Sequence, residues 1–230
     1  MDKIEYLNKV KTIIEYIDRV NLAIKNANDD TTKLTNVELT IPGMSSRKNK
    51  ILLNSLLDNK SRYLEIGSYF GSTYVAANYK NNPSYSLAID NFSEFVGDDD
   101  EVAKVIGQPS AEALKINCER SGVKFNFINN DCFSLTSDQL SSIKDINVYL
   151  YDGGHKEKEQ IQALTYYKDC LEDIFILIVD DWNDERARVG TRTGFKLNNI
   201  TVHKEWELFS RVNGDKDTWW NGFYVAVCEK

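Results

Sequence analysis

The sequence predicts an α/β fold built on one mostly parallel sheet, and three observations carry this prediction. Five runs of apolar and β-branched residues recur along the chain with helical patterns between them, which is typical of parallel strands joined by helices. Two more runs near the C-terminus flank a polar loop and indicate an antiparallel hairpin at the sheet edge. The length of 230 residues suits a single domain, residues 1–230, and is too short for two ordinary catalytic domains. The seven predicted strands are residues 63–66, 86–89, 125–128, 148–151, 174–179, 201–209 and 223–228.

Residues 1–57 are expected to form a helical extension with a turn, and residues 58–230 the doubly wound core. The extension begins with an amphipathic helix over residues 4–24, continues with a turn at residues 41–46 and ends in a second helix over residues 48–57. The first helix has one apolar stripe, made of Ile4, Leu7, Val10, Ile14, Ile17, Val20 and Ile24. Two roles are open for this stripe: it packs on its own domain, or it forms the subunit interface of a homo-oligomer.

Capping signals predict the helices of the core. Ser110 is an N-cap for a helix that stops near Gly122, Thr136 forms a capping box with Gln139, and residues 157–171 have apolar residues at helical spacing. The alternation breaks after the fifth strand, where no helix is assigned.

The first strand ends in an acid and runs into a glycine turn, YLEIGSYFGST. Gly67 and Gly71 are spaced GxxxG, which differs from the GxGxxG that binds a dinucleotide pyrophosphate. Glu65 would repel phosphate but suits an ammonium or a sulfonium ligand. Ser72 and Thr73 open the following helix. The turn therefore favours a cationic cofactor, and the alternative is a turn with no ligand.

Acids also end the next two strands. Because ligands of an open parallel sheet bind at the carboxyl ends of its strands, these acids are candidate contacts. Asp90 follows the second strand about twenty residues after the glycine turn, where a carboxylate accepts both hydroxyls of a ribose. Asp131 follows the third strand and either accepts from an adenine amine or caps a turn.

The fourth and fifth strands end in three aspartates, which predict a metal site. Asp152 follows one strand, and Asp180 and Asp181 follow the other. Carboxylates so close raise one another's pKa unless a cation compensates, and ligands that are all oxygens select a hard ion such as Mg²⁺. The alternative is that these aspartates are N-caps of the following helices.

His155 lies three residues after Asp152 and is one of two histidines in the chain. Its reference pKa of ~6.5 suits a general base for a hydroxyl near a metal. The alternative is that it orients the cofactor. The other histidine, His203, is expected at the sheet edge.

Composition excludes several classes of partner. The net charge of −7 argues against nucleic acid, which is bound through clustered Lys and Arg. The acidic residues 98–101 are expected to be a solvated loop.

The scattered Cys118, Cys132, Cys170 and Cys228 indicate reduced thiols and no zinc site. The N-terminus has neither a signal-peptide core nor a membrane-spanning run, so we expect a cytoplasmic protein with no membrane partner.

Together, the segments PGMSS, YLEIGSYFGST, AIDNF, NNDCF, YLYDGGH, VDDW and WWNG resemble a known family, the bacterial metal-dependent sugar O-methyltransferases related to macrocin O-methyltransferase. These belong to class I S-adenosylmethionine-dependent methyltransferases, and the resemblance, from about residue 41 onward, implies their Rossmann-like fold. It implies that Asp152, Asp180 and Asp181 hold Mg²⁺ and that His155 and Asp152 are catalytic. The residues it places around S-adenosylmethionine are Met44, Ser45, Glu65, Gly67, Tyr69, Gly71, Thr73, Asp90 and Asp131. We expect further contacts with the cofactor from residues of the same segments: Ser68, Ser72, Asn91, Phe92, Cys132, Asp152, Gly154 and His155.

Two positions depart from the more distant catechol O-methyltransferases. His155 stands where those enzymes carry a catalytic lysine, which preserves a base. Asp181 stands where they carry an asparagine, which adds a negative charge.

The expected function is S-adenosylmethionine-dependent transfer of a methyl group to a hydroxyl of a small molecule, such as a sugar, a nucleotide-sugar or a natural product. One alternative is a metal-dependent hydroxylase or hydrolase on the same sheet, and another is a non-catalytic module that binds S-adenosylmethionine. Trp219 and Trp220 are expected in the hairpin and core, with a substrate wall as the alternative. Three arginines could contact an anionic part of the acceptor: Arg186, Arg188 and Arg192.

Overall fold

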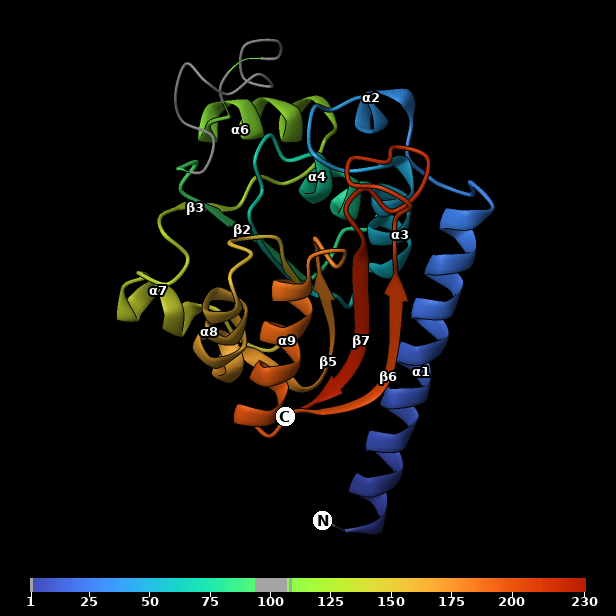
Figure 1. Cartoon of the computed structure of the whole chain (residues 1–230), viewed down its shortest axis with the longest axis vertical. Coiled ribbons are helices and arrows are strands. Elements are labelled where there is room, and N and C mark those ends of the chain that lie inside the picture. The colour runs from blue at the N-terminus through green and yellow to red at the C-terminus, as the bar shows by residue number, and fades with distance from the viewer. Residues whose placement is uncertain (1, 94–106, 108) are drawn as a thin grey trace.

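A seven-stranded sheet is the centre of the molecule, and its strand order is β3-β2-β1-β4-β5-β7-β6 (Figure 1). The computed structural model describes residues 2–93, 107 and 109–230. Strand β7 runs antiparallel to β5 and β6, and the other pairs are parallel. The predicted α/β class, seven strands and C-terminal antiparallel pair are confirmed. The strands are β1 (Arg62–Ile66), β2 (Tyr85–Asp90), β3 (Phe127–Asn129), β4 (Ile146–Tyr151), β5 (Leu171–Val179), β6 (Thr201–Leu208) and β7 (Phe223–Glu229).

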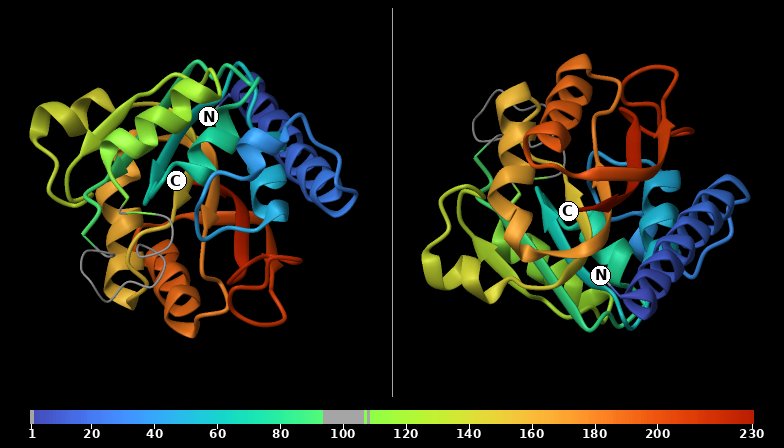
Figure 2. Two further views of the ribbon diagram at one scale, coloured as in Figure 1. Left: turned by 90° about the horizontal axis from the view of Figure 1, so that it is seen from above. Right: turned by 90° about the horizontal axis from the view of Figure 1, so that it is seen from below.

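Helices cover both faces of the sheet, as the two views of Figure 2 show. Ser110 caps α6 by accepting from the backbone N–H of Ala113, and Thr136 and Gln139 form the capping box of α7, as predicted. The helices are α1 (Lys3–Asn28), α2 (Asn36–Leu39), α3 (Arg47–Leu56), α4 (Ser72–Asn78), α6 (Ala111–Arg120), α7 (Ser137–Ser142), α8 (Glu157–Tyr167), the 3₁₀ turn η1 (Lys168–Cys170) and α9 (Glu185–Leu197).

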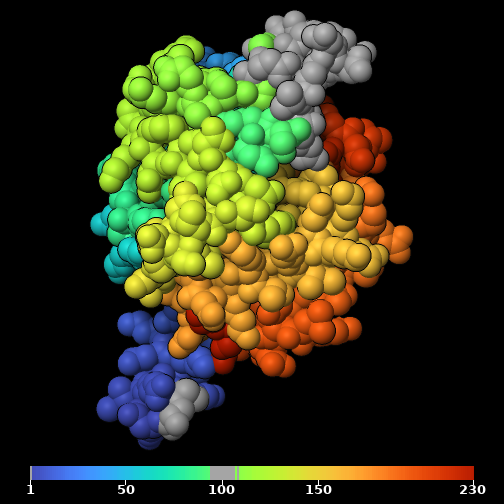
Figure 3. Space-filling view, turned by 90° about the vertical axis from the view of Figure 1, so that its left-hand side faces the viewer, coloured from blue at the N-terminus to red at the C-terminus, as the bar shows by residue number. Residues whose placement is uncertain are grey.

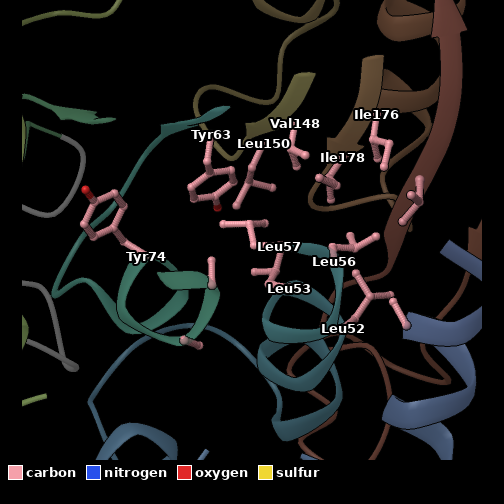
Figure 4. Packing of buried hydrophobic residues seen from close by; sticks show 14 of the residues in the cluster. Leu52, Leu53, Leu56, Leu57, Tyr63, Tyr74, Val148, Leu150, Ile176 and Ile178 are labelled. Atoms are coloured by element: carbon pink, nitrogen blue, oxygen red, sulfur yellow. The ribbon is translucent and has the colours of Figure 1, made fainter. Parts of the chain in front are cut away.

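The core divides into two apolar clusters, one on each face of the sheet. Because side chains alternate along a strand, Tyr63 of β1 joins the cluster under α1, α3 and α4, whereas Leu64 joins the cluster under α8 and α9. Figure 4 shows the first cluster, in which Leu53 and Leu56 of α3 point toward the β4 and β5 side chains. Full burial of each leucine contributes about 2 kcal/mol. These clusters hold the strand ends in fixed positions.

Some elements differ from the prediction. The helix expected over residues 157–171 ends at Tyr167, and Leu171 already begins β5. Helix α9 was not predicted at all. Its two glycines, Gly190 and Gly194, have low helix propensity, but they pack directly against α8, so tertiary contact overrides propensity. The acidic loop predicted at residues 98–101 lies outside the described residues.

Helix α1 is buried along its C-terminal half, and nearer its N-terminus Lys9 pairs with Glu229 and Ile13 packs against the core. Its buried residues are Tyr16, Val20, Ala23 and Ala27. Ile4 of the predicted stripe is 71% exposed and Ile14 is 54% exposed. The N-terminal end of the helix projects beyond the body in Figures 1 and 3. The stripe therefore serves its own core in part, and its exposed portion is considered below.

The cysteines are unpaired in the structure. Among the described helices, none is both long enough and apolar enough to span a bilayer.

Candidate active site

A cavity of about 850 Å³ lies at the carboxyl ends of β1, β2, β4 and β5. The strand order reverses at β1, because the chain leaves β1 for β2 on one side and later returns to β4 on the other. Such a reversal opens the crevice where ligands of doubly wound sheets bind. Most residues predicted to surround the cofactor line this cavity: Met44, Ser45, Gly67, Tyr69, Ser72, Thr73, Asp90, Asn91, Phe92, Asp131, Cys132, Asp152, Gly154 and His155.

The two glycines of the first turn are required by contacts within the protein. Gly67 and Gly71 both have φ +82°, a conformation that other residues rarely adopt. A Cβ on Gly67 would lie 1.8 Å from the carbonyl oxygen of Asp152, and one on Gly71 would lie 2.7 Å from Leu114. Gly67 therefore lies directly against the end of β4, which brings the cofactor turn and the aspartates together.

Glu65 lies buried beneath the turn and does not line the cavity. Ser68 and Gly71, which are part of the turn, do not line the cavity either. The Glu65 carboxyl is fully buried and accepts hydrogen bonds from the hydroxyls of Tyr63 and Thr73, the latter at 2.8 Å. Burial raises the pKa of Glu65 to about 7. The direct contact predicted between Glu65 and a cationic ligand is thus replaced by a role in holding the turn.

Asp90 ties the glycine turn to the end of β2. Its carboxylate accepts from the backbone N–H of Tyr69 at 2.8 Å and of Phe92 at 2.7 Å. Asp131 accepts from the backbone N–H of Phe133 at 2.9 Å and also lines the cavity. Asp131 is therefore a turn cap that also faces the cavity, so the two predicted roles are compatible.

The turn before α3 closes the cavity on its N-terminal side. The buried ammonium of Lys50 donates to the carbonyls of Leu39 and Ile41 at 2.8 and 3.0 Å, which holds the turn in place. Burial lowers the pKa of Lys50 to about 8. The Ser45 hydroxyl has no hydrogen-bond partner among the described residues, so it is available to a ligand.

The three predicted metal ligands come together at the ends of β4 and β5. One carboxylate oxygen each of Asp152, Asp180 and Asp181 lies within 4.8 Å of the others. Burial and mutual repulsion raise the pKa of both Asp152 and Asp180. Oδ1 of Asp180 is buried and has no partner among the described residues. An oxygen-only cluster with an unsatisfied buried atom fits a hard divalent cation.

The alternative role of these aspartates, as helix N-caps, is wrong. Lys156 occupies the N-cap position of α8, and Asp184 caps α9 by accepting from the backbone N–H of Arg186.

His155 and Asn221 hold Asp181 from two sides. Nε2 of His155 lies 3.0 Å from Oδ2 of Asp181, and Nδ2 of Asn221 donates to Oδ1 at 2.5 Å. Asn221 precedes β7 and was not predicted as a site residue, although it belongs to the WWNG segment that carries the resemblance. Only the fold brings it beside Asp181, 40 residues away in the sequence.

The two tryptophans before β7 lie in different environments. Trp219 is 8% exposed and packs in the core, as predicted. Trp220 has φ +61° and lines the cavity, which agrees with the alternative of a substrate wall.

The three arginines expected to contact an anionic part of the acceptor are all engaged by other groups of the protein. Arg188 donates to the carbonyl of Trp182, and Arg192 pairs with two glutamates of β6. Arg186 lines the cavity but is paired with Asp184. The cavity is therefore acidic: among its described lining residues, Asp90, Asp131, Asp152, Glu159, Asp180, Asp181 and Asp184 outnumber Lys156 and Arg186.

His203, on the edge strand β6, pairs with Glu229 of β7 at 2.8 Å, and it does not line this cavity.

No protein-family model matches this chain, and no curated protein matches it either. Solved structures do match in fold. Cofactor-bound Rv0187 from MTB aligns over 91% of this chain and 89% of its own, at 13% identity and a TM-score of 0.53. M. jannaschii TYW2 in complex with AdoMet aligns over 87% and 80%, at 11% identity and a TM-score of 0.52.

M. capricolum TrmK in complex with S-adenosylhomocysteine aligns over 79% of this chain, at 11% identity and a TM-score of 0.50. The chain covers 66% of TrmK, just under two thirds of its length. The narrower resemblance to macrocin-type enzymes finds no counterpart in these comparisons and stays a prediction. The sheet order, the position of the cavity and these similarities establish that the chain has the Rossmann-like fold of S-adenosylmethionine-dependent methyltransferases.

Proposed function

We propose that this protein transfers a methyl group from S-adenosylmethionine to a hydroxyl of a small molecule, with Mg²⁺ held by Asp152, Asp180 and Asp181. The observation that carries the proposal is that the carboxylate cluster with His155 lines the same cavity as the glycine turn.

The cofactor end of the cavity suits S-adenosylmethionine. Asp90, held by two backbone N–H groups, presents carboxylate oxygens to ribose hydroxyls. Asp131 and the unpartnered Ser45 hydroxyl offer further polar contacts to the adenine and methionine parts. Fixing the sulfonium and the acceptor in line is the main requirement of a methyl transfer, because such placement lowers the barrier by ~7 to 11 kcal/mol.

The other end suits a hydroxyl acceptor. When bound to the aspartates, Mg²⁺ supplies a Lewis acid that makes an acceptor hydroxyl more acidic. His155 lies at the edge of this cluster and removes the proton of that hydroxyl. Asp181 orients the imidazole through the 3.0 Å contact, and Asn221 holds Asp181 in turn.

RNA is one acceptor class that this proposal excludes. An acidic cavity and a net charge of −7 repel a phosphate backbone. The charge balance therefore favours a small molecule.

The two alternative functions predict different results for cofactor binding and methyl transfer. A hydroxylase or hydrolase on the same fold would not need S-adenosylmethionine, and a non-catalytic module would bind it without methyl transfer.

Asp180→Asn tests the proposal, because it removes a metal ligand and keeps the side-chain volume. We expect the variant to bind S-adenosylhomocysteine as tightly as the wild type by calorimetry, and to lose Mn²⁺ binding measured by electron paramagnetic resonance. Transfer of labelled methyl groups to a panel of methyl glycosides, nucleotide-sugars, catechol and unmodified tRNA should fall by at least ~100-fold.

A matched control is Asp138→Asn, on α7 and outside the cavity. Full transfer in excess chelator would remove the metal from the proposal. Failure of the wild type to bind S-adenosylhomocysteine would overturn the proposal entirely.

A further inference from the structure

The outward face of α1 has apolar side chains that no described part of the chain covers. Leu7, Ile14 and Leu22 are 54%, 54% and 55% exposed. At 100° per residue they lie on the side of the helix opposite to its buried residues. Figure 1 shows α1 along the side of the molecule, and Figure 3 shows its N-terminal end projecting beyond the body. A row of large apolar side chains in this position is typical of an interaction surface.

Two charged residues interrupt this row and make it self-complementary. Lys11 lies between Leu7 and Ile14, and Asp18 lies between Ile14 and Leu22, all at steps of three or four residues. Both charged side chains are exposed, and neither forms an ion pair within the described part of the chain. Along the helix, apolar side chains therefore alternate with a base and then an acid, and Ile14 is at the centre. The order is Leu7, Lys11, Ile14, Asp18 and Leu22.

We propose that this row, the α1 face, is the interface of a homodimer in which two copies of α1 pack antiparallel about a two-fold axis beside Ile14. In this arrangement Lys11 faces Asp18 of the partner subunit and Leu7 faces Leu22 of the partner subunit. Ile14 meets its own counterpart at the axis. A two-fold axis demands this reciprocity, because residue i must contact j while j contacts i.

Charge selects this arrangement over others. A parallel pairing in register would set Lys11 against Lys11 and Asp18 against Asp18. A membrane-bound helix carries its charges away from its apolar face, whereas here an acid and a base lie within it. The buried side of each α1 faces its own body, so the two bodies lie outside the helix pair and do not obstruct it.

The interface is small, since it consists of one helix face from each copy. Standard stable interfaces bury ~1,600 Å² in total, and weaker ones bury less than ~1,200 Å². We therefore expect a weak dimer, in equilibrium with the monomer over an accessible range of protein concentration. This inference does not rest on the proposed function.

Sedimentation velocity of the full chain over a range of concentrations tests the proposal. The wild type should shift from monomer to dimer as concentration rises, and Ile14→Glu should abolish the shift by placing two carboxylates at the axis. Leu197→Glu is the matched control, because Leu197 is 66% exposed on α9 and should leave the dimer unchanged. Circular dichroism checks that both variants fold.

A charge exchange tests the orientation of the helices. Lys11→Glu alone and Asp18→Lys alone should each weaken the dimer about tenfold, and the double variant should restore it, because the pairing is only reversed. A wild type that stays monomeric at all concentrations, or a dimer that Ile14→Glu does not disturb, would overturn the proposal. A double variant weaker than either single variant would overturn the antiparallel arrangement.

Discussion

Glu65 is the residue whose environment departs most from what its position in the motif predicts. It occupies the acid position of the cofactor motif, yet its carboxyl is fully buried and engaged by two hydroxyls. Its pKa is about 7, against 4.5 in an unfolded chain. The folded state therefore holds a proton on this group between those values, and the stability from this protonation is lost as pH rises from about 4.5 through 7.

Glu65→Gln should reveal this loss. The variant keeps the volume of the side chain and cannot ionise, so the wild type should become less stable relative to it as pH rises. The change should amount to roughly 3 kcal/mol between about pH 4.5 and pH 8. Urea unfolding of both proteins at several pH values measures it, and a difference that does not vary with pH would contradict the buried ionisation.

Gly67 tests the contact between the cofactor turn and β4. Gly67→Ala would bring a Cβ to 1.8 Å from the Asp152 carbonyl oxygen, and we expect a loss of ~1–3 kcal/mol from this overpacking in addition to the strain of φ +82°. S-adenosylhomocysteine affinity should fall with it.

Gly122→Ala is a close control for backbone strain. Gly122 also has positive φ, +63°, but nothing lies within 4 Å of a Cβ there. It should lose only the ~1–2 kcal/mol of a left-handed alanine. Thermal unfolding measures the loss of stability in both variants. If Gly67→Ala and Gly122→Ala lose the same unfolding free energy, the contact with β4 contributes nothing to it.

At the scale of elements, the pairing of α8 and α9 positions the wall of the cavity that follows β4 and β5. The two helices meet at Gly190, where a Cβ would lie 2.6 Å from Cβ of Gln160 and 2.7 Å from the carbonyl oxygen of Glu157. Propensity alone predicts that alanine would stabilise α9 by ~1 kcal/mol at this site. The contact predicts the opposite sign.

Gly190→Ala should therefore destabilise the protein by about 1–2 kcal/mol, because overpacking outweighs propensity. Val189→Ala is the neighbouring control, since Val189 is 41% exposed, and it should change stability by less than about 0.5 kcal/mol. Denaturant unfolding decides between the two signs, and a stabilised Gly190→Ala would show that the helices separate without cost.

At the scale of the whole molecule, charge decides which partners are accessible. The chain has a net charge of −7, and acids outnumber bases among the charged residues that line the cavity at the carboxyl ends of the strands. Nucleic-acid binding is strongest at low salt, because counterion release drives it.

We expect fluorescence anisotropy to detect no binding of labelled tRNA at micromolar protein, even at about 50 mM salt. A parallel titration with S-adenosylhomocysteine confirms that the same sample is folded and active in binding. Tight binding of tRNA that weakens steeply with salt would contradict the small-molecule acceptor.

Local signals in the sequence account for the order and type of most elements and for the acids at the strand ends. Strand periodicity and capping residues are local signals, since they depend on neighbours within a few positions, and the strands, the caps of α6 and α7 and the aspartates after β4 and β5 followed from them.

The contacts between groups that are distant in the sequence follow from tertiary packing alone. It buried Glu65 under the turn, excluded helix capping by the three aspartates, formed α9 against propensity and brought Asn221 to Asp181. The physical reason is that burial and long-range hydrogen bonds arise from the packing of distant segments, so no local spacing encodes them.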